Sequence, residues 1–379
     1  MFILAFLVII LVLVLIHEFG HFYAAKKFGI KVLEFGFGLP PRAWGKKIGE
    51  TIYSLNWLPI GGFVRLLGED ETDKKLLDDK RSFAYQSISK RIVVVVAGVF
   101  MNLLLAWVLF YFVVIAQNFK VQVPLLTDFK FAGVTQVNET VVVINKVLDN
   151  SPAKSAGLKT GDKVVAINGE EIKSAEEFIE KTKANLGKEI KLTVADLQDT
   201  SRKEVAVTPR ENPPANEGAL GVGLDGMNVA NLIYEKPYQK LLSGPIHAYN
   251  ILIYTGATFG KIFSISQEQK TLEPVAYSVG GPIAIVFTIK EFLNLKSFIP
   301  LIDLAANMSL ILAFVNVLPI PALDGGRLLF LVIEAFTRKK VPANIEAKIH
   351  AAGMMVLLGL ILLITYKDIR VYILNWSPF

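Results

Sequence analysis

The chain has 379 residues, of which 53% are hydrophobic and 20% are charged, and its mean hydropathy is +0.46. Soluble proteins are more polar, so this composition indicates a membrane-embedded part joined to a soluble part. The net charge of +6 does not imply nucleic acid as a partner, because basic residues also gather on the inner side of a membrane. The chain has no cysteine, so disulfides give no indication of its compartment.

The first apolar segment covers residues 1–25 and is interrupted only by a short polar motif at residues 17–21. A helix needs about 20 apolar residues to cross a bilayer, so this segment is long enough. A cleaved signal peptide is the alternative. We favour the membrane span, because the start carries no basic residue and no small-residue cleavage site follows it.

Three further segments are apolar enough to span a membrane, at residues 92–116, 299–318 and 351–366. Lysine and arginine gather between the first and second segments and again after the third. The positive-inside rule puts both of these connections in the cytoplasm. The termini and the middle region, residues 117–298, are then expected to lie outside.

Residues 246–265 are apolar enough to suggest a fifth span. An extra crossing would put His17 and Asp324 on opposite faces of the membrane and would move the basic residues 338–340 outside. We therefore favour an amphipathic helix that lies at the outer membrane interface. A fifth span is the alternative.

Two soluble regions have distinct patterns. Residues 31–68 combine glycine, proline and alternating apolar residues, which is typical of short strands and turns, so we expect a β-hairpin close to the membrane. Residues 69–81 are charged and polar and are expected to form a mobile cytoplasmic loop.

Residues 135–210 are expected to form a small α/β domain. Strand-like runs occupy residues 141–147, 163–167 and 189–194. A helix is expected at residues 175–184, because Ser174 and Glu177 have the spacing of a capping box.

The motif His17-Glu18-Phe19-Gly20-His21 is an HExxH sequence on an expected helix. Residues four apart share a helical face, so both imidazoles can bind one ion. Zinc suits imidazole nitrogen, and a catalytic zinc needs a third ligand and an open position for water, whose proton Glu18 can take. A chance motif is the alternative, but ionisable groups inside an apolar segment are costly and usually functional.

Asp324 is the expected third zinc ligand. It follows the third apolar segment in NVLPIPALDGG, where prolines end the helix and glycines let the backbone approach another element. A turn with a capping aspartate is the alternative. Asn316 can bond a substrate backbone or the developing oxyanion, or it can join two helices. Asn102 is assigned to helix packing, and His247 and His350 are not expected to be ligands.

HEFGH in the first span with LDGG after the third resembles the site-2 proteases, the M50-type intramembrane zinc metalloproteases. Within them the chain is most similar to the bacterial regulator-of-sigma-E type. Further matching motifs are GFG at residues 36–38, LPIGGFV at 58–64 and GGPIAI at 280–285. The family's AGPxxN of the second span is present at residues 97–102 without its proline.

This resemblance implies roles for individual residues. His17, His21 and Asp324 match the zinc ligands, Glu18 matches the catalytic base, and Asn316 matches the asparagine of the NxxPxxxLDG motif. The hairpin at Gly36, Phe37 and Gly38 resembles the family's membrane-associated β-loop, in which an unpaired strand edge holds the substrate in extended form.

The soluble domain resembles a PDZ domain, which binds peptides by strand addition. The motifs that carry the likeness are SPA at residues 151–153, AGL at 156–158, GDK at 161–163 and ING at 167–169. GALGVGL, around Gly221, is a candidate carboxylate-binding loop. A size filter that excludes bulky ectodomains is an equal alternative to a peptide-binding site, and only one such domain is found.

We therefore expect a polytopic α-helical membrane protein with about four transmembrane helices, a membrane-associated β-hairpin and an extracytoplasmic α/β PDZ-like domain. The expected divisions are residues 1–116 with HExxH and the β-loop, 117–225 with the PDZ-like domain, 226–298 with interfacial helices, and 299–379 with LDGG.

The expected function is that of a zinc metalloprotease in the bacterial inner membrane, which hydrolyses a peptide bond inside the transmembrane segment of single-span proteins. The resemblance suggests an anti-sigma factor or remnant signal peptides as substrates. The lipid bilayer and a peptide ligand of the PDZ-like domain are expected partners, and nucleic acid is not. A zinc or proton transporter and a membrane scaffold are the alternatives, but a transporter predicts symmetric repeats that the sequence lacks.

Overall fold

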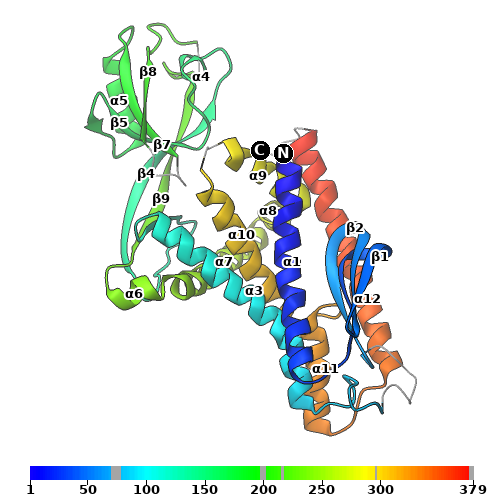
Figure 1. Cartoon of the computed structure of the whole chain (residues 1–379). Helices are drawn as coiled ribbons and strands as arrows, with labels where there is room; N and C mark the ends of the chain where they lie inside the picture. The colour runs from blue at the N-terminus through cyan, green and yellow to red at the C-terminus, as the bar shows by residue number, and fades with distance from the viewer. Residues whose placement is uncertain (70–77, 197–201, 215–216, 295–296, 375–379) are drawn as a thin grey trace. The chain divides into compact units, whose positions relative to one another are not determined.

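The computed structural model describes residues 1–69, 78–196, 202–214, 217–294 and 297–374 (Figure 1). These residues form two compact units, which are described separately. Unit 1 comprises Met1–Phe110 with Ile262–Phe379, and unit 2 comprises Tyr111–Lys261. Most of the loop expected at residues 69–81 lies outside the described residues.

Four helices of the described chain are long and apolar enough to cross a membrane. They are α1 (Phe2–Lys27), α3 (Ile88–Ala116), α10 (Ile299–Val317) and the segment Asn344–Ile373, formed by α12 (Ala343–Asp368) and the π-helical turn η1 (Ile369–Ile373). Few of their apolar side chains are buried within the chain, which is unfavourable in water but not in lipid. The four expected spans are confirmed as candidate spans, and the chain has the helices of a multi-pass membrane protein.

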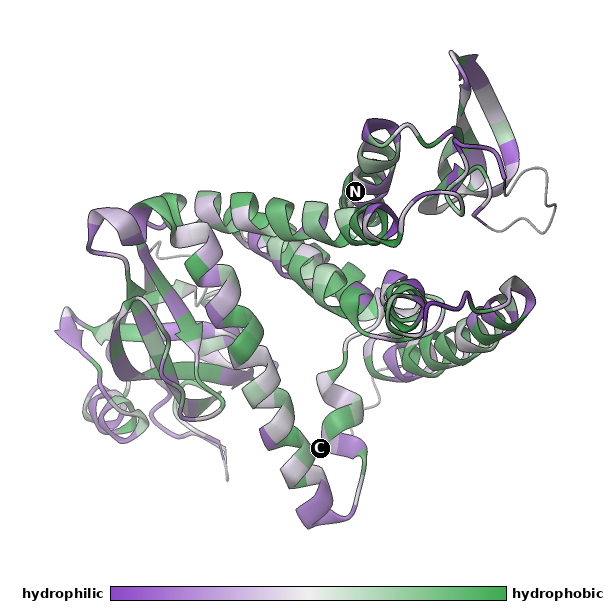
Figure 2. Cartoon of the chain, turned by 90° about the horizontal axis from the view of Figure 1, so that it is seen from below, coloured by the Kyte–Doolittle hydropathy of each residue, from purple (hydrophilic) through white to green (hydrophobic). Residues whose placement is uncertain are grey.

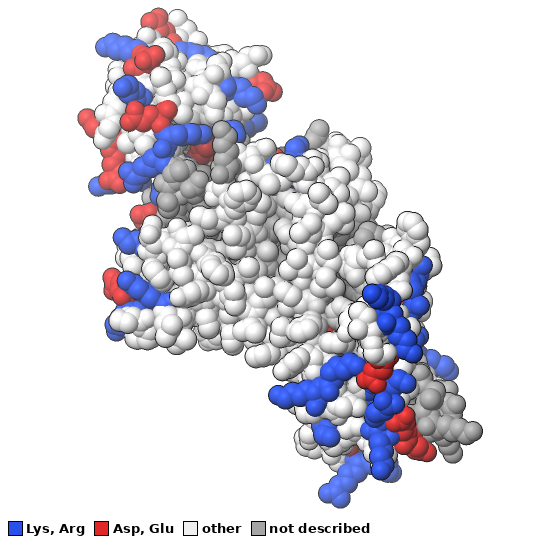
Figure 3. All heavy atoms as spheres, viewed as in Figure 1, with Lys and Arg blue, Asp and Glu red and all other residues white. Residues whose placement is uncertain are grey.

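These helices consist predominantly of hydrophobic residues (Figure 2). Lysine and arginine side chains gather instead at one end of unit 1, beyond the uncharged surface (Figure 3). The sequence places basic residues there because α1 ends in Lys26 and Lys27, and the first turn of α3 carries Lys90. This distribution is typical of the cytoplasmic end of a membrane protein.

The strands β1 (Val32–Ile48) and β2 (Thr51–Leu66) form the hairpin expected near the membrane. Both strands bend, so the hairpin folds back on itself: Gly36 pairs with Phe63 and also with Ser54. The GFG segment of β1 therefore lies inside the small sheet. Residues 62–66 of β2 pair on one side with β1, and no further strand pairs with them in the described chain.

The remaining helices of unit 1 are α8 (Glu273–Ser278), α9 (Pro282–Asn294) and α11 (Asp324–Thr337). Helix α9 packs against α1, α10 and α12. Its N-terminus is held by Asp368, a buried carboxylate at the end of α12 that accepts hydrogen bonds from the backbone N–H groups of Gly281 and Ala284. Helix α11 is tied to α3 by a buried ion pair between Arg91 and Glu334, 2.5 Å apart.

Unit 2 contains a sheet with the strand order β3-β9-β4-β5-β7-β8, and β6 pairs with β5. Its strands are β3 (Lys120–Pro124), β4 (Thr135–Val147), β5 (Asp162–Ile167), β6 (Glu170–Glu171), β7 (Ile190–Asp196), β8 (Arg202–Val207) and β9 (Val222–Ile233). The short helices are α4 (Pro152–Ser155), α5 (Ala175–Ala184) and α6 (Pro237–Leu241).

The three strands expected from the sequence of unit 2 are confirmed, and so is the helix. Helix α5 has the expected bounds, and the Ser174 side chain accepts a hydrogen bond from the Glu177 N–H, as the capping box predicts. The apolar core lies between α5 and the sheet, around Phe178, Leu192 and Leu220.

Helix α7 (Ser243–Gln269) covers the segment for which two predictions were open. It is a continuous helix, and it is not among the four candidate spans of the described chain. Within unit 2 it turns polar side chains inward: Asn250 donates to and accepts from the Ala132 backbone, and the Tyr254 hydroxyl donates to the Pro124 carbonyl. These polar contacts within unit 2 favour the expected interfacial helix over a fifth span.

Candidate metal centre

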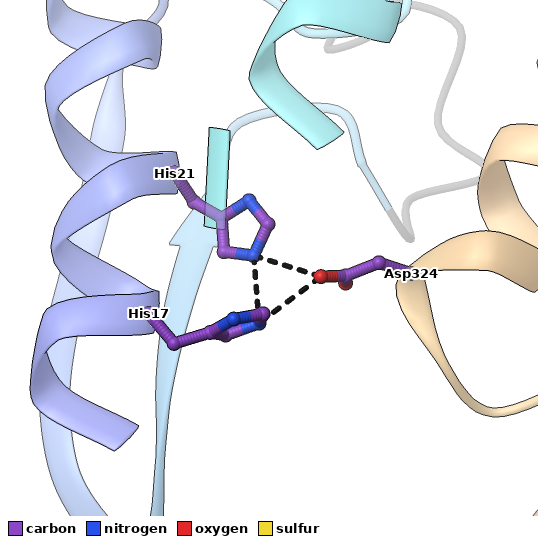
Figure 4. Close-up of side chains that lie close together, drawn as sticks. All are labelled: His17, His21 and Asp324. Carbon is purple, nitrogen blue, oxygen red and sulfur yellow. Dashed lines mark hydrogen bonds and ion pairs between the residues drawn. The ribbon is translucent and has the colours of Figure 1, made fainter. Parts of the chain in front are cut away.

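The two histidines of the HExxH motif lie one turn apart on α1 and meet an aspartate from a distant part of the chain (Figure 4). The Nε2 atoms of His17 and His21 are 3.2 Å apart. The Asp324 Oδ2 lies 3.0 Å from His17 Nε2 and 3.2 Å from His21 Nε2. Among the described residues these three form a group that could hold a metal ion.

The dimensions of this triangle fit zinc. Bonds of 2.0–2.1 Å in tetrahedral geometry place neighbouring ligand atoms about 3.3 Å apart, close to the three separations. Two imidazole nitrogens and one carboxylate oxygen are also a set of donors that catalytic zinc sites use. The Asp324 Oδ2 is buried and its close neighbours are the two imidazole nitrogens, so it faces the position that an ion would occupy.

A bent loop between α10 and α11 brings Asp324 to the histidines. A Cβ on Gly325 would meet the Leu318 carbonyl, so only glycine lets the loop close this tightly before the helix starts. Ala322 has a positive φ of 79°, and its N–H donates to His350 Nδ1 on α12 at 2.8 Å. His350 is not a member of the metal-binding group. It holds the loop that carries Asp324.

One face of α3 lies against both histidines. The His21 Nδ1 is 2.9 Å from the Val94 carbonyl, and the His17 Nδ1 is 3.5 Å from the Asn102 amide nitrogen. Between them, a Cβ on Gly98 would meet both imidazole rings. The backbone of α3 can therefore approach the HExxH motif only because residue 98 has no side chain.

A cavity of about 420 Å³ opens beside these residues, and Glu18, His21 and Asp324 line it. Residues 63–66 of β2 form another part of its wall. Strand β2 also approaches α1 closely at Gly62, where a Cβ would lie 3.2 Å from the Glu18 Cγ. Glu18 and a strand with one free edge therefore line the same cavity.

The structure brings together most of the site residues predicted from the sequence. His17, His21 and Asp324 converge, and Glu18 lies on the cavity. Asn316 is half-buried in the last turn of α10 and is not part of the cavity wall. The residues Gly36, Phe37 and Gly38 are also not in the wall. The nearby strand edge belongs to residues 62–66, because the GFG segment is paired on both sides.

Some residues of the site were not predicted. Asn102 was assigned to packing, but it lies against His17. Arg327, paired with Glu69, lines the cavity one turn after Asp324. The sequence carries one signal for the role of Asn102. Gly98 and Asn102 are four residues apart and share one face of α3, just as His17 and His21 share one face of α1, so the two faces can meet.

Four candidate spans, an HExxH helix within the first and a converging aspartate define a membrane-embedded metallopeptidase. The chain belongs to peptidase family M50, whose family model matches residues 5–360. Proteins of this family are zinc-dependent, and the chain is a zinc metalloprotease.

Its relatives match over nearly the full length. A protein of Clostridium perfringens that is named as a zinc metalloprotease is 32% identical over 94% of this chain and 95% of its own. A protein of Nostoc with the same description is 32% identical over 97% and 95%. The regulator of sigma-W protease RasP of Bacillus subtilis is 26% identical over 97% and 98%.

Proposed function

We propose that this metalloprotease cleaves peptide bonds inside the membrane, with His17, His21 and Asp324 as zinc ligands and Glu18 as the catalytic base. The observation that carries the proposal is the convergence of three ligand atoms, 3.0–3.2 Å apart, two of which come from a helix apolar enough to span a membrane. Ionisable groups are costly there, so their presence supports a catalytic role.

The chemistry follows from the groups on the cavity. A bound zinc would supply a Lewis acid for the scissile carbonyl and for the attacking water. Glu18, adjacent to His17 in the chain, takes the proton from the water and delivers it to the leaving amine. The imidazoles of His17 and His21 and the carboxylate of Asp324 would hold the zinc, and three protein ligands would leave it able to bind a water.

The substrate segment is proposed to bind as an extended strand. A transmembrane helix must unwind before its peptide bonds can be attacked, and strand addition stabilises the unwound form. The free edge of β2 at residues 62–66 is suited to this, because it lies on the cavity wall next to Glu18. Gly36, Phe37 and Gly38 then support the edge from inside the sheet. Asn316 remains a candidate for contacts with the substrate backbone.

The substrate is proposed to be a single-span membrane protein that has already been trimmed outside the membrane. The name of the Bacillus subtilis relative, a regulator of sigma-W protease, is consistent with an anti-sigma factor as substrate. Remnant signal peptides are the second candidate, because they too are short and apolar. Both substrates would be single helices with small flanking regions.

We place the protein in the bacterial inner membrane, with the hairpin in the cytoplasm and unit 2 outside. The hairpin carries exposed Trp44 and Trp57, 60% and 72% exposed, and such side chains favour the interface between lipid and water. On α7, Tyr249 and Ile253 are exposed, and they lie on a different side of the helix from the buried His247, Asn250 and Tyr254. This exposed apolar face supports contact of α7 with the outer membrane surface.

Unit 2 is proposed to be a PDZ-like domain. Strand β3 pairs with β9 only from Val229 to Ile233, so residues 222–227 of β9 have a free edge in the described chain. Helix α5 contacts β9, and Gly221, directly before the strand, has a positive φ of 69°. A strand edge beside a helix favours a peptide-binding groove over a size filter. Binding of a C-terminal peptide, lost when its carboxylate is amidated, would distinguish the two.

The first test is cleavage of a tagged single-span substrate in membranes by the native chain and by Glu18→Gln. The native chain is expected to cleave, and the variant is expected to lose at least about 100-fold in rate, because general-base catalysis contributes that much. Glu291→Gln, at an exposed glutamate of α9, is the matched control and should cleave normally. Equal cleavage by Glu18→Gln, at equal zinc content, would exclude the assigned base.

A further inference from the structure

The face of α3 that lies against the HExxH motif is spaced like the motif itself. Val94, Gly98 and Asn102 follow one another at intervals of four residues and therefore share one helical face. His21 meets the first of them and His17 meets the last. Each imidazole thus has its Nδ1 atom directed at a polar group of α3, while its Nε2 atom is directed at the other histidine and at Asp324.

Binding of a metal at Nε2 dictates where the imidazole proton lies. A neutral imidazole that binds through Nε2 carries its proton on Nδ1, and that proton needs an acceptor. His21 has one, because the Val94 carbonyl lies 2.9 Å from its Nδ1. His17 needs an equivalent acceptor, and the only group of the described chain within hydrogen-bond distance of its Nδ1 is the Asn102 amide.

The Asn102 amide can meet this need. Its side chain is buried, its nitrogen lies 3.5 Å from the His17 Nδ1, and its Oδ1 is buried without a hydrogen-bond partner among the described residues. A half-turn of the amide exchanges oxygen and nitrogen with little change in shape. With the nitrogen toward His17 the amide donates to an unprotonated Nδ1. With the oxygen toward His17 it accepts the Nδ1 proton of the metal-binding tautomer.

A contact from α10 fixes the position of Asn102. The Ser309 hydroxyl of α10 donates to the Asn102 backbone carbonyl at 2.8 Å, and Ser309 is fully buried. This contact joins α10, which leads to Asp324, to the turn of α3 that faces His17. Simple helix packing would need the backbone contact alone. It gives no reason for a buried amide directed at a ligand ring.

We propose that Asn102 is a positioning residue for zinc: its amide oxygen accepts the His17 Nδ1 proton and holds the imidazole in the tautomer that binds metal through Nε2. The inference rests on the proposed zinc ligands, but not on cleavage of any substrate. The same amide, turned over, satisfies the metal-free imidazole, so Asn102 gives His17 a partner in both states.

The test is zinc affinity, measured on the purified full-length protein by competition with a chelator. Asn102→Leu keeps a side chain branched at Cγ but removes the acceptor, and it is expected to weaken zinc binding by about 10–100-fold, as losses of such partners do. Asn102→Asp keeps an acceptor and is expected to bind zinc within a few-fold of the native chain. Asn307→Leu is the matched control, because among the described residues the Asn307 side chain bonds only to Asp303 on its own helix.

A second measurement does not depend on any variant. Nitrogen-15 NMR of labelled histidine in the zinc-loaded native chain should show His17 protonated at Nδ1, with this proton in a hydrogen bond. An affinity of Asn102→Leu within twofold of the native value would overturn the proposal, as would His17 protonated at Nε2. A native chain that binds zinc but cleaves no substrate would count against the proposed function, and the zinc affinities of the variants would still decide the role of Asn102.

Discussion

At the scale of single residues, the site depends on a glycine that leaves space for the imidazoles as well as on the residues that could bind the metal. Gly98 has no side chain, and a Cβ there would lie 2.9 Å from the His17 Cε1 and would also meet the His21 Nε2. Helices usually avoid glycine, which costs about 0.5–1 kcal/mol relative to alanine. Its presence in the middle of α3 is explained by the two imidazoles that occupy the space beside it.

The substitution Gly98→Ala is therefore expected to lower zinc affinity by about tenfold or more without altering any ligand, because the new methyl group displaces the imidazoles. Chelator competition measures the loss. Gly256→Ala on α7 is the matched control: nothing lies within 4 Å of a Cβ there, so zinc affinity should stay native and helix propensity should improve. Native zinc binding by Gly98→Ala would show that the two helices can separate at this point.

At the scale of elements, four parts of the chain each supply one component of the site. Helix α1 supplies the HExxH motif, α3 supplies partners for the Nδ1 atoms, and the start of α11 supplies Asp324. Helix α12 holds the Asp324 loop twice, through His350 and through Gly353, where a Cβ would meet Pro321. The fourth candidate span, α12, has few polar residues, but it supports the loop that carries Asp324. Its sequence alone does not show this role.

Helix α7 likewise contributes a buried histidine with a polar partner to unit 2. His247 is buried, and its Nδ1 lies 2.8 Å from the Tyr234 hydroxyl. Burial disfavours the charged imidazole and lowers the pKa of His247 to about 4, from an ordinary value of about 6.5. Since the unfolded chain takes up this proton more readily, folding stability should rise with pH between about 4 and 6.5.

The expected loss on acidification across that window is about 3 kcal/mol from this residue. Hydrogen exchange of the β3 and β9 amides in the full-length protein, corrected for the intrinsic pH dependence, measures it. His247→Gln keeps a polar side chain but does not titrate, so its protection should vary less with pH. A native chain with the same protection at pH 4.5 and pH 7 would contradict the burial argument.

At the scale of the whole molecule, the sequence predicted local features well and distant contacts poorly. The HExxH pair, the capping box at Ser174 and the four apolar segments depend on residues close together in the chain, where helical and strand periodicity applies. Asp324 could be added to the predicted zinc ligands because ionisable groups are rare inside membranes. Asn102 and the pair formed by Glu69 and Arg327 could not, because their meaning depends on which helical faces touch.

The hairpin illustrates a related limit. Alternating apolar residues predicted strands at 31–68, and the structure has them. The pattern did not reveal that both strands bend, so that Gly36 pairs with Phe63 on one side and Ser54 on the other. Register in a folded-back hairpin is set by bulges and tertiary contacts rather than by periodicity. The free edge therefore lies at β2, which only the three-dimensional arrangement shows.

The proposed membrane topology can be tested directly because the chain has no cysteine, so single cysteines report one position each. Lys46→Cys on the hairpin, Lys188→Cys in unit 2 and Lys339→Cys after α11 all replace exposed residues. The four-span arrangement predicts that a membrane-impermeant maleimide added from outside labels position 188 only. Positions 46 and 339 should react only after the membrane is opened. A crossing by α7 would move the segment after it to the opposite side of the membrane. Labelling of position 339 from outside would therefore contradict an interfacial α7. It would also mean that the expected zinc ligands lie on opposite sides of the membrane.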